Sequence, residues 1–179
     1  MAVSLSMAEL PSSPPRASTF RLRLAIVLLT LSLFGCDHAT KLAAETSLSH
    51  GGSVNVVTGI LELRYAPNYD TAFSLLRTFN IARPPSVLLA ASALALALVL
   101  AMWIASRKHA SRVQHVGFAL VLAGALGNVV DRATRGYVVD FIHLTRWPVF
   151  NVADMAVVAG MLLLVLASLR KPYESAGHP

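Results

Sequence analysis

The sequence predicts an all-α membrane protein of four transmembrane helices with a small β-element outside the bilayer. Hydrophobic residues make up 55% of the chain and charged residues only 13%, whereas a soluble domain has about 25% charged residues. Each of four apolar runs approaches the ~20 residues that a helix needs to cross a bilayer. The runs are Phe20 to about Leu42, Ser86 to Ala105, about Val113 to Val130, and Val152 to Leu169.

The first run has a short purely apolar core, Leu24 to Cys36. A helix in this region spans the bilayer only if it carries Asp37 and Lys41 at its far end. The two residues form an i, i+4 pair of the favourable order. The pair is either a structural ion pair near the interface or a functional one, because ionisable residues inside membranes are costly and often functional.

Small residues recur in the third and fourth runs. They are Gly117, Ala123, Gly124, Gly127 and Gly160. In lipid, where the hydrophobic effect does not hold helices together, small residues allow helix backbones to approach closely. We therefore expect a compact bundle.

Lysine and arginine cluster before the first run, between the second and third, and after the fourth. These residues are Arg16, Arg21, Arg23, Arg107, Lys108, Arg112, Arg170 and Lys171. Because cytoplasmic loops are enriched in Lys and Arg, both termini are predicted to be cytoplasmic. Residues 1–19, rich in proline and serine, are predicted to form a disordered tail, and residues 170–179 a second cytoplasmic tail.

The β-element is predicted between about residues 44 and 83, on the outer side of the membrane. The segment from Val54 to Phe73 is rich in Val, Ile, Leu, Tyr and Phe. Gly51-Gly52 precedes this segment and Pro67-Asn68 lies inside it, a pattern typical of short strands joined by a turn.

Other classes of site are disfavoured. The net charge is +6, but the basic residues are dispersed without interleaved aromatics, so no nucleic-acid partner is predicted. A single cysteine, Cys36, excludes an internal disulfide and a cysteine-built metal site. The six histidines are scattered. No metal site is predicted.

Two aspartates in apolar surroundings, Asp140 and Asp154, are the leading candidates for chemistry. A carboxylate at membrane depth costs roughly 2.5 to 3.5 kcal/mol, so it seldom lacks a partner or a task. Asn151 and Asp154 fit the N-cap and N3 positions of the fourth helix. The helix N-terminus would favour ionised Asp154, while burial would raise the pKa of Asp140. An aspartic hydrolase needs one charged and one protonated carboxyl, although paired acids also serve ion transport.

Three polar residues end the third run. Asn128, Asp131 and Arg132 follow i, i+3, i+4 spacing and so share roughly one face of a helix. They are either a helix-end cluster, in which Arg132 and Arg135 offset Asp131, or part of a site. Asn128 still lies inside the apolar run, which favours a site.

These residues belong to a set of strings that together resemble lipoprotein signal peptidase, also called signal peptidase II. The strings occur in the family's order and cover about Phe20 to Leu169. They are Asp37-His38-Ala39-Thr40-Lys41, Asn68-x-x-x-Ala72-Phe73, Gly124-Ala125-x-Gly127-Asn128-x-x-Asp131-Arg132-x-x-x-Gly136-x-x-x-Asp140-Phe141-Ile142 and Phe150-Asn151-x-Ala153-Asp154.

The resemblance implies a bacterial inner-membrane aspartic endopeptidase that removes signal peptides from prolipoproteins. Cleavage falls just before a cysteine that carries diacylglycerol, so the partners are lipid-modified prolipoproteins and membrane lipids. The fold implied is four transmembrane helices with a periplasmic β-cradle, and an active site near the periplasmic face. No metal or organic cofactor is implied. Asp140 and Asp154 match the catalytic aspartates, and the other matching polar positions are Asn128, Arg132, Asn151, Asn68, Asp37 and Lys41.

One position departs from the family, and two other classes stay open. Asp70 stands where the family usually has glycine, so a catalytically impaired homologue is one alternative. Leu33-Phe34-Gly35-Cys36 after Arg21 and Arg23 imitates the signal peptide of a lipoprotein. A small proton- or ion-coupled carrier would use the same buried acids.

Overall fold

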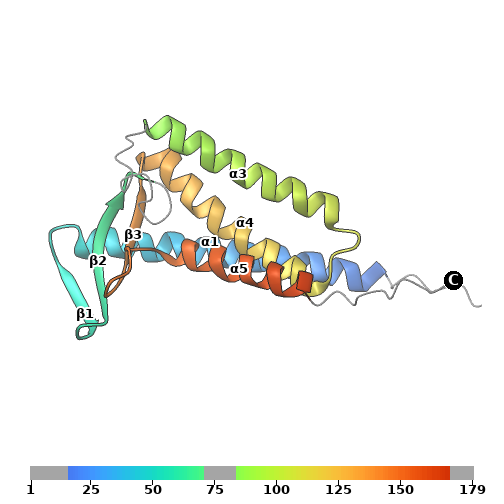
Figure 1. Cartoon of the computed structure of the whole chain (residues 1–179), viewed down its shortest axis with the longest axis horizontal. Coiled ribbons are helices and arrows are strands. Elements are labelled where there is room, and N and C mark those ends of the chain that lie inside the picture. Colours follow the sequence, from blue (N-terminus) through green and yellow to red (C-terminus); the bar gives the residue numbers. More distant parts are fainter. Residues whose placement is uncertain (1–15, 71–83, 170–179) are drawn as a thin grey trace, which may run out of the picture.

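The computed structural model describes residues 16–70 and 84–169. It contains four long helices (Figure 1): α1 (Arg16–Leu48), α3 (Pro85–Ser106), α4 (Arg112–Arg135) and α5 (Val152–Leu169). The longest strand is β2 (Leu61–Asn68). Two shorter strands, β1 (Ser53–Val57) and β3 (Val138–Leu144), flank β2 in one sheet. All four helices are long and apolar enough to cross a membrane. Most of the first predicted tail, the second tail and the predicted β-residues from Thr71 onward lie outside the described residues.

The first helix extends further than its apolar run predicted. It begins at Arg16 and ends at Leu48, beyond the predicted limits Phe20 and Leu42. Polar residues after Lys41 do not break it, and threonine hydroxyls find acceptors in the helix's own carbonyls. Thr46 Oγ1, for example, donates to the Leu42 carbonyl at 2.9 Å. The helix therefore carries Asp37 and Lys41 well inside its length.

Helices α4 and α5 approach each other through glycines. A Cβ atom on Gly117 would lie 3.0 Å from the Gly160 carbonyl oxygen, and one on Gly160 would lie 2.6 Å from the Gly117 carbonyl oxygen. Gly124 would meet the Ala153 carbonyl in the same way. The predicted role of the small residues in close helix packing is confirmed. Helix α4 is central, packing against α1, α3 and α5, while α3 packs mainly against α4.

Local signals define both ends of α4. At its start Ser111 and Gln114 form a capping box, with the Gln114 N–H donating to Ser111 Oγ at 3.2 Å. At its end Gly136 has a left-handed φ of 80° and donates its N–H to the Arg132 carbonyl, a conformation that favours glycine. The chain then turns directly into β3, which places Asp140 beside the end of α4.

The sheet lies at one end of the bundle, with strand order β1-β2-β3 and antiparallel pairing (Figure 1). Its third strand was not predicted. Val138 to Phe141 are all buried, and a short buried apolar run lacks the alternation that signals a strand. The β2–β3 register pairs Ala66 with Asp140 and Asn68 with Val138.

The predicted turn at Pro67-Asn68 is wrong, because both residues lie in β2. The turn between β1 and β2 is instead at residues 58–60, where the Ile60 N–H donates to the Val57 carbonyl at 2.9 Å. Proline is tolerated in β2 because β1 pairs no further along it than Arg64. At Pro67 the strand has no β1 neighbour that would need its N–H.

Candidate active site

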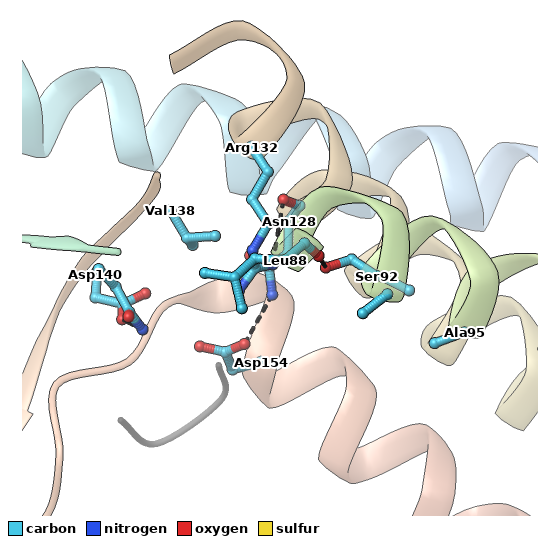
Figure 2. A pocket seen from close by; sticks show the side chains of 11 residues that line it. Leu88, Ser92, Ala95, Asn128, Arg132, Val138, Asp140 and Asp154 are labelled. Atoms are coloured by element: carbon cyan, nitrogen blue, oxygen red, sulfur yellow. Dashed lines mark hydrogen bonds between the residues drawn. The ribbon is translucent and has the colours of Figure 1, made fainter. Parts of the chain in front are cut away.

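A pocket of about 300 Å³ lies where α3, α4, β3 and the first turn of α5 meet (Figure 2). Its polar wall brings together five residues that the sequence singled out. They are Asn68, Asn128, Arg132, Asp140 and Asp154. The opposite wall is formed by small and apolar residues of α3, which carry no sequence signal beyond an Ala/Leu-rich run. These are Leu88, Ala91, Ser92 and Ala95.

Asp140 is held by two amides. Its side chain is buried, with 3% exposed. Asn68 Nδ2 donates to its Oδ2 at 2.8 Å, and Asn151 Nδ2 donates to its Oδ1 at 2.7 Å. Burial, followed by the nearby charge of Asp154, raises the pKa of Asp140 from 3.8 to about 7. The prediction that apolar surroundings raise this pKa is confirmed, and the carboxyl keeps a proton that an exposed aspartate would lose.

Asp154 lies in the first turn of α5. Its N–H donates to Asn151 Oδ1 at 2.9 Å, while the Asn151 N–H donates to Asp154 Oδ2 at 3.3 Å. This reciprocal pair is the predicted N-cap arrangement, which is confirmed. Asn128 Nδ2 donates to the other oxygen, Oδ1, at 2.8 Å. Two N–H groups, one on each oxygen, thus donate to a carboxylate at a helix N-terminus, where the helix dipole favours its charged form.

The two asparagines also contact each other. Asn151, buried with 0% exposed, donates from Nδ2 to Asn128 Oδ1 at 3.2 Å. Because the same Nδ2 donates to Asp140, the two amides join the two acidic side chains into one network. Asn151 supports the pocket from behind and does not line it.

Arg132 lines the pocket one helical turn after Asn128. Its Nη2 donates to the main-chain carbonyl of Asp70 at 2.9 Å. The Asp70 N–H in turn donates to Asn68 Oδ1 at 2.9 Å. The turn that contains Asp70 therefore positions both Arg132 and Asn68 at the pocket.

Asp37 and Lys41 lie beneath the pocket rather than in its wall. Lys41 Nζ contacts Asp37 Oδ2 at 2.8 Å, which confirms the predicted i, i+4 ion pair, and it also contacts Asp131 Oδ2 at 2.9 Å. Asp37 Oδ1 accepts the Ala153 N–H at 2.8 Å, an N–H at the start of α5 that has no partner within the helix. Gly127 makes this possible, because a Cβ there would lie 2.6 Å from Asp37 Oδ2.

Asp131 belongs to the same buried layer, and the sequence had left it open whether this residue is part of a helix-end cluster or of a site. It is 1% exposed, pairs with Lys41 and with Arg135 Nη1, and accepts the Val139 N–H at 3.3 Å. Asp131 thus ties α4 to the strand that carries Asp140. The available signal was its i, i+4 spacing to Arg135. Within residues 16–70 and 84–169, no cluster of three His, Cys, Asp or Glu side chains is arranged to hold a metal ion.

Four apolar helices and a pocket lined by one buried and one half-buried carboxyl group define a multi-pass membrane protein with an enzyme-like site. The model of the family described as signal peptidase (SPase) II matches residues 29–170. The chain therefore belongs to the signal peptidase II family, and the resemblance of its motifs is confirmed.

Similar proteins span nearly the whole chain. A lipoprotein signal peptidase of Geobacter sulfurreducens is 33% identical over 162 residues, covering 88% of this chain and 98% of that protein. One of Francisella tularensis subsp. novicida is 35% identical over 153 residues, covering 83% and 94%. A solved structure described as a bacterial membrane enzyme superposes with a TM-score of 0.73 at 25% identity, covering 87% of this chain and 93% of that one.

Proposed function

We propose that the chain is an aspartic endopeptidase that removes the signal peptide from diacylglyceryl-modified prolipoproteins, cutting just before the lipidated cysteine. The observation that carries the aspartic mechanism is the pocket itself, where Asp140 and Asp154 meet within one network of amide donors. Membership in the signal peptidase II family supports cleavage of lipoprotein signal peptides. It favours this function over a carrier or a lipoprotein.

The surroundings of the two carboxyl groups suggest different roles. Asp154 accepts two N–H donors at a helix N-terminus, so it is the charged member and takes a proton from the attacking water. Asp140, whose pKa is raised to about 7, is the protonated member and donates to the scissile carbonyl oxygen.

The proton balance closes over one turnover. Water oxygen attacks the carbonyl carbon, Asp154 takes the water proton, and Asp140 protonates the carbonyl oxygen to give a tetrahedral diol. The C–N bond then breaks as Asp154 returns its proton to the leaving nitrogen of the lipidated cysteine. Asp140 recovers a proton from the diol as the new carboxyl group forms. The mechanism uses neither an acyl-enzyme nor a metal or organic cofactor.

The pocket walls fit an apolar peptide that carries a polar backbone. Leu88, Ala91 and Ala95 of α3 offer a wall for small apolar side chains near the cleavage site. Asn68 and Arg132 lie opposite, where their N–H groups can donate to substrate carbonyl oxygens. Since α3 packs mainly against α4, we propose that substrate enters from the lipid beside α3.

We further propose that the peptidase domain spans residues 20–169 in the bacterial inner membrane. Basic residues lie in the α3–α4 joint and at the chain ends, which supports cytoplasmic termini and a periplasmic sheet that cradles the substrate. The pocket lies at the sheet end of the bundle, so the active site would face the periplasm.

The test uses purified protein in detergent with a prolipoprotein that carries diacylglycerol on its cysteine. We expect a new, shorter lipoprotein band on a gel, also in the presence of a metal chelator. The same precursor without the lipid is the matched control, and it should stay uncut. Failure to cut the lipidated precursor would contradict the proposed function.

A further inference from the structure

Lys41 is fully buried and has no unused donor. Its side chain is 0% exposed. Nζ lies 2.8 Å from Asp37 Oδ2, 2.9 Å from Asp131 Oδ2 and 3.0 Å from Asn128 Oδ1. An ammonium group has three N–H donors, so every donor has an acceptor. Two acceptors are carboxylates, and the third is a neutral amide that lines the pocket.

Charge balance explains two of these three contacts. The carboxylates of Asp37 and Asp131 are matched by the cations of Lys41 and Arg135, whose Nη1 contacts Asp131 Oδ1 at 2.5 Å. Such matching is what buried ions need. The contact with Asn128 adds nothing to the charge balance, so it needs another explanation.

The explanation lies in the two ends of the Asn128 amide. Oδ1 accepts from Lys41 Nζ at 3.0 Å and from Asn151 Nδ2 at 3.2 Å, while Nδ2 donates to Asp154 Oδ1 at 2.8 Å. A 180° flip would turn the NH₂ group toward two donors and the carbonyl toward a carboxylate. The ammonium is the charged, and hence the stronger, of the two donors that oppose this flip.

We propose that Lys41 is a positioning residue for the reaction, whose ammonium holds the Asn128 amide with its NH₂ group directed at Asp154. The inference rests on the proposed function, which makes Asp140 and Asp154 the reacting groups. Lys41 does not line the pocket and acts through Asn128. Because Asn151 donates to both Asn128 and Asp140, an Asn128 amide of fixed orientation also keeps the Asp140 side chain in position.

A double-mutant cycle tests the route of the effect. We expect Lys41→Met to lower kcat about 10- to 100-fold with KM within about twofold, less than the 10²- to 10³-fold typical of deleting a donor outright. In an Asn128→Leu protein the same Lys41→Met change should cause no further loss of kcat, because the amide through which Lys41 acts is already absent. Losses that multiply in the double variant would overturn the proposal.

Arg135→Met is the matched control for a structural role. It removes the other cation from Asp131 without touching Asn128, so it should lower the thermal midpoint and leave kcat within about twofold. An equal loss of kcat in Arg135→Met and Lys41→Met would overturn the positioning role. If Lys41→Met does not fold, Asp37→Asn restores the charge balance, and the cycle is measured with Asp37→Asn in every protein.

An activity-independent measurement separates this inference from the proposed function. The chain has five asparagines, so ¹⁵N-asparagine labelling gives five side-chain amide signals, and Asn128→Leu identifies the relevant one. We expect this signal to move in Lys41→Met and to stay in Arg135→Met, both without substrate. A parent protein that cuts no lipidated precursor would refute the proposed function, whereas an unmoved Asn128 signal would refute the inference alone.

Discussion

Two pairs of aspartates lie at the same end of the bundle in contrasting surroundings. Asp37 and Asp131 contact the cations of Lys41 and Arg135 and are almost fully buried. Asp140 and Asp154 accept from neutral amides and line a pocket of about 300 Å³. We call them the lower pair and the pocket pair.

The difference separates two uses of a buried acid. Each carboxylate of the lower pair contacts a cation that compensates the cost of burying its charge. In the pocket pair, amides orient the carboxyl groups without neutralising them, and burial, followed by the charge of Asp154, raises the pKa of Asp140 to about 7. Stability should depend on the lower pair, and cleavage on the pocket pair.

The largest effect is expected from the pocket pair. Asp140→Asn and Asp154→Asn should each reduce cleavage of the lipidated precursor by at least about 10³-fold, because an amide cannot exchange the required proton. Their thermal midpoints should stay close to that of the parent. Near-parental cleavage by either variant would show that the pair is not catalytic.

The lower pair should show the opposite behaviour. Asp131→Asn removes the carboxylate that Lys41 and Arg135 share, and breaking such a buried pair costs about 3 kcal/mol of unfolding free energy. Chemical unfolding in detergent measures this loss. A variant as stable as the parent would remove the distinction between the two pairs.

A larger side chain on α4 should disturb the lower pair, because α4 packs closely against Asp37. In Gly127→Ala the new methyl would lie 2.6 Å from Asp37 Oδ2, so we expect a loss of about 1 to 3 kcal/mol from overpacking. Gly35→Ala on α1 is the control, since no atom lies within 4 Å of its Cβ position. That variant should be neutral or slightly more stable, because alanine is the better helix former. Equal stabilities for the two variants would contradict the close fit at Gly127.

The pH dependence of the cleavage rate should follow the protonation of the pocket pair. Cleavage requires protonated Asp140, so the rate should fall as pH rises through about 7, the raised pKa of this carboxyl. The Asn68 hydrogen bond lowers that pKa, so Asn68→Ala should move the basic limb to higher pH. Since coupled acids titrate as a unit, the limb reports the pair. A basic limb unmoved in Asn68→Ala would contradict the assignment.

The smallest effect is expected at Asp70, the departure from the family pattern. Its described hydrogen bonds to Asn68 and Arg132 use main-chain atoms, which glycine also has. Asp70→Gly should keep or improve cleavage and move the acidic limb lower by about half a pH unit, because a like charge is removed. Loss of cleavage would show that the Asp70 side chain itself contributes.

The sequence alone was sufficient for the membrane class, the four helices, the small residues between them and the two aspartates of the pocket pair. Each depends on local information: the length of an apolar run, the i, i+4 spacing of Asp37 and Lys41, or the capping pattern of Asn151 and Asp154. The cost of burying charge makes such residues conspicuous in an apolar chain. The family resemblance of the motifs then added their expected roles.

Tertiary structure decided which acids share a pocket and which share cations. Strand β3 was missed because Val138 to Phe141 are buried without alternation, and it is this strand that brings Asp140 to the end of α4. The contacts of Lys41 with Asp131 and Asn128 join residues far apart in the chain. The spacing of residues in the sequence does not predict such pairs, because only the packing of α1 against α4 brings them within hydrogen-bonding distance.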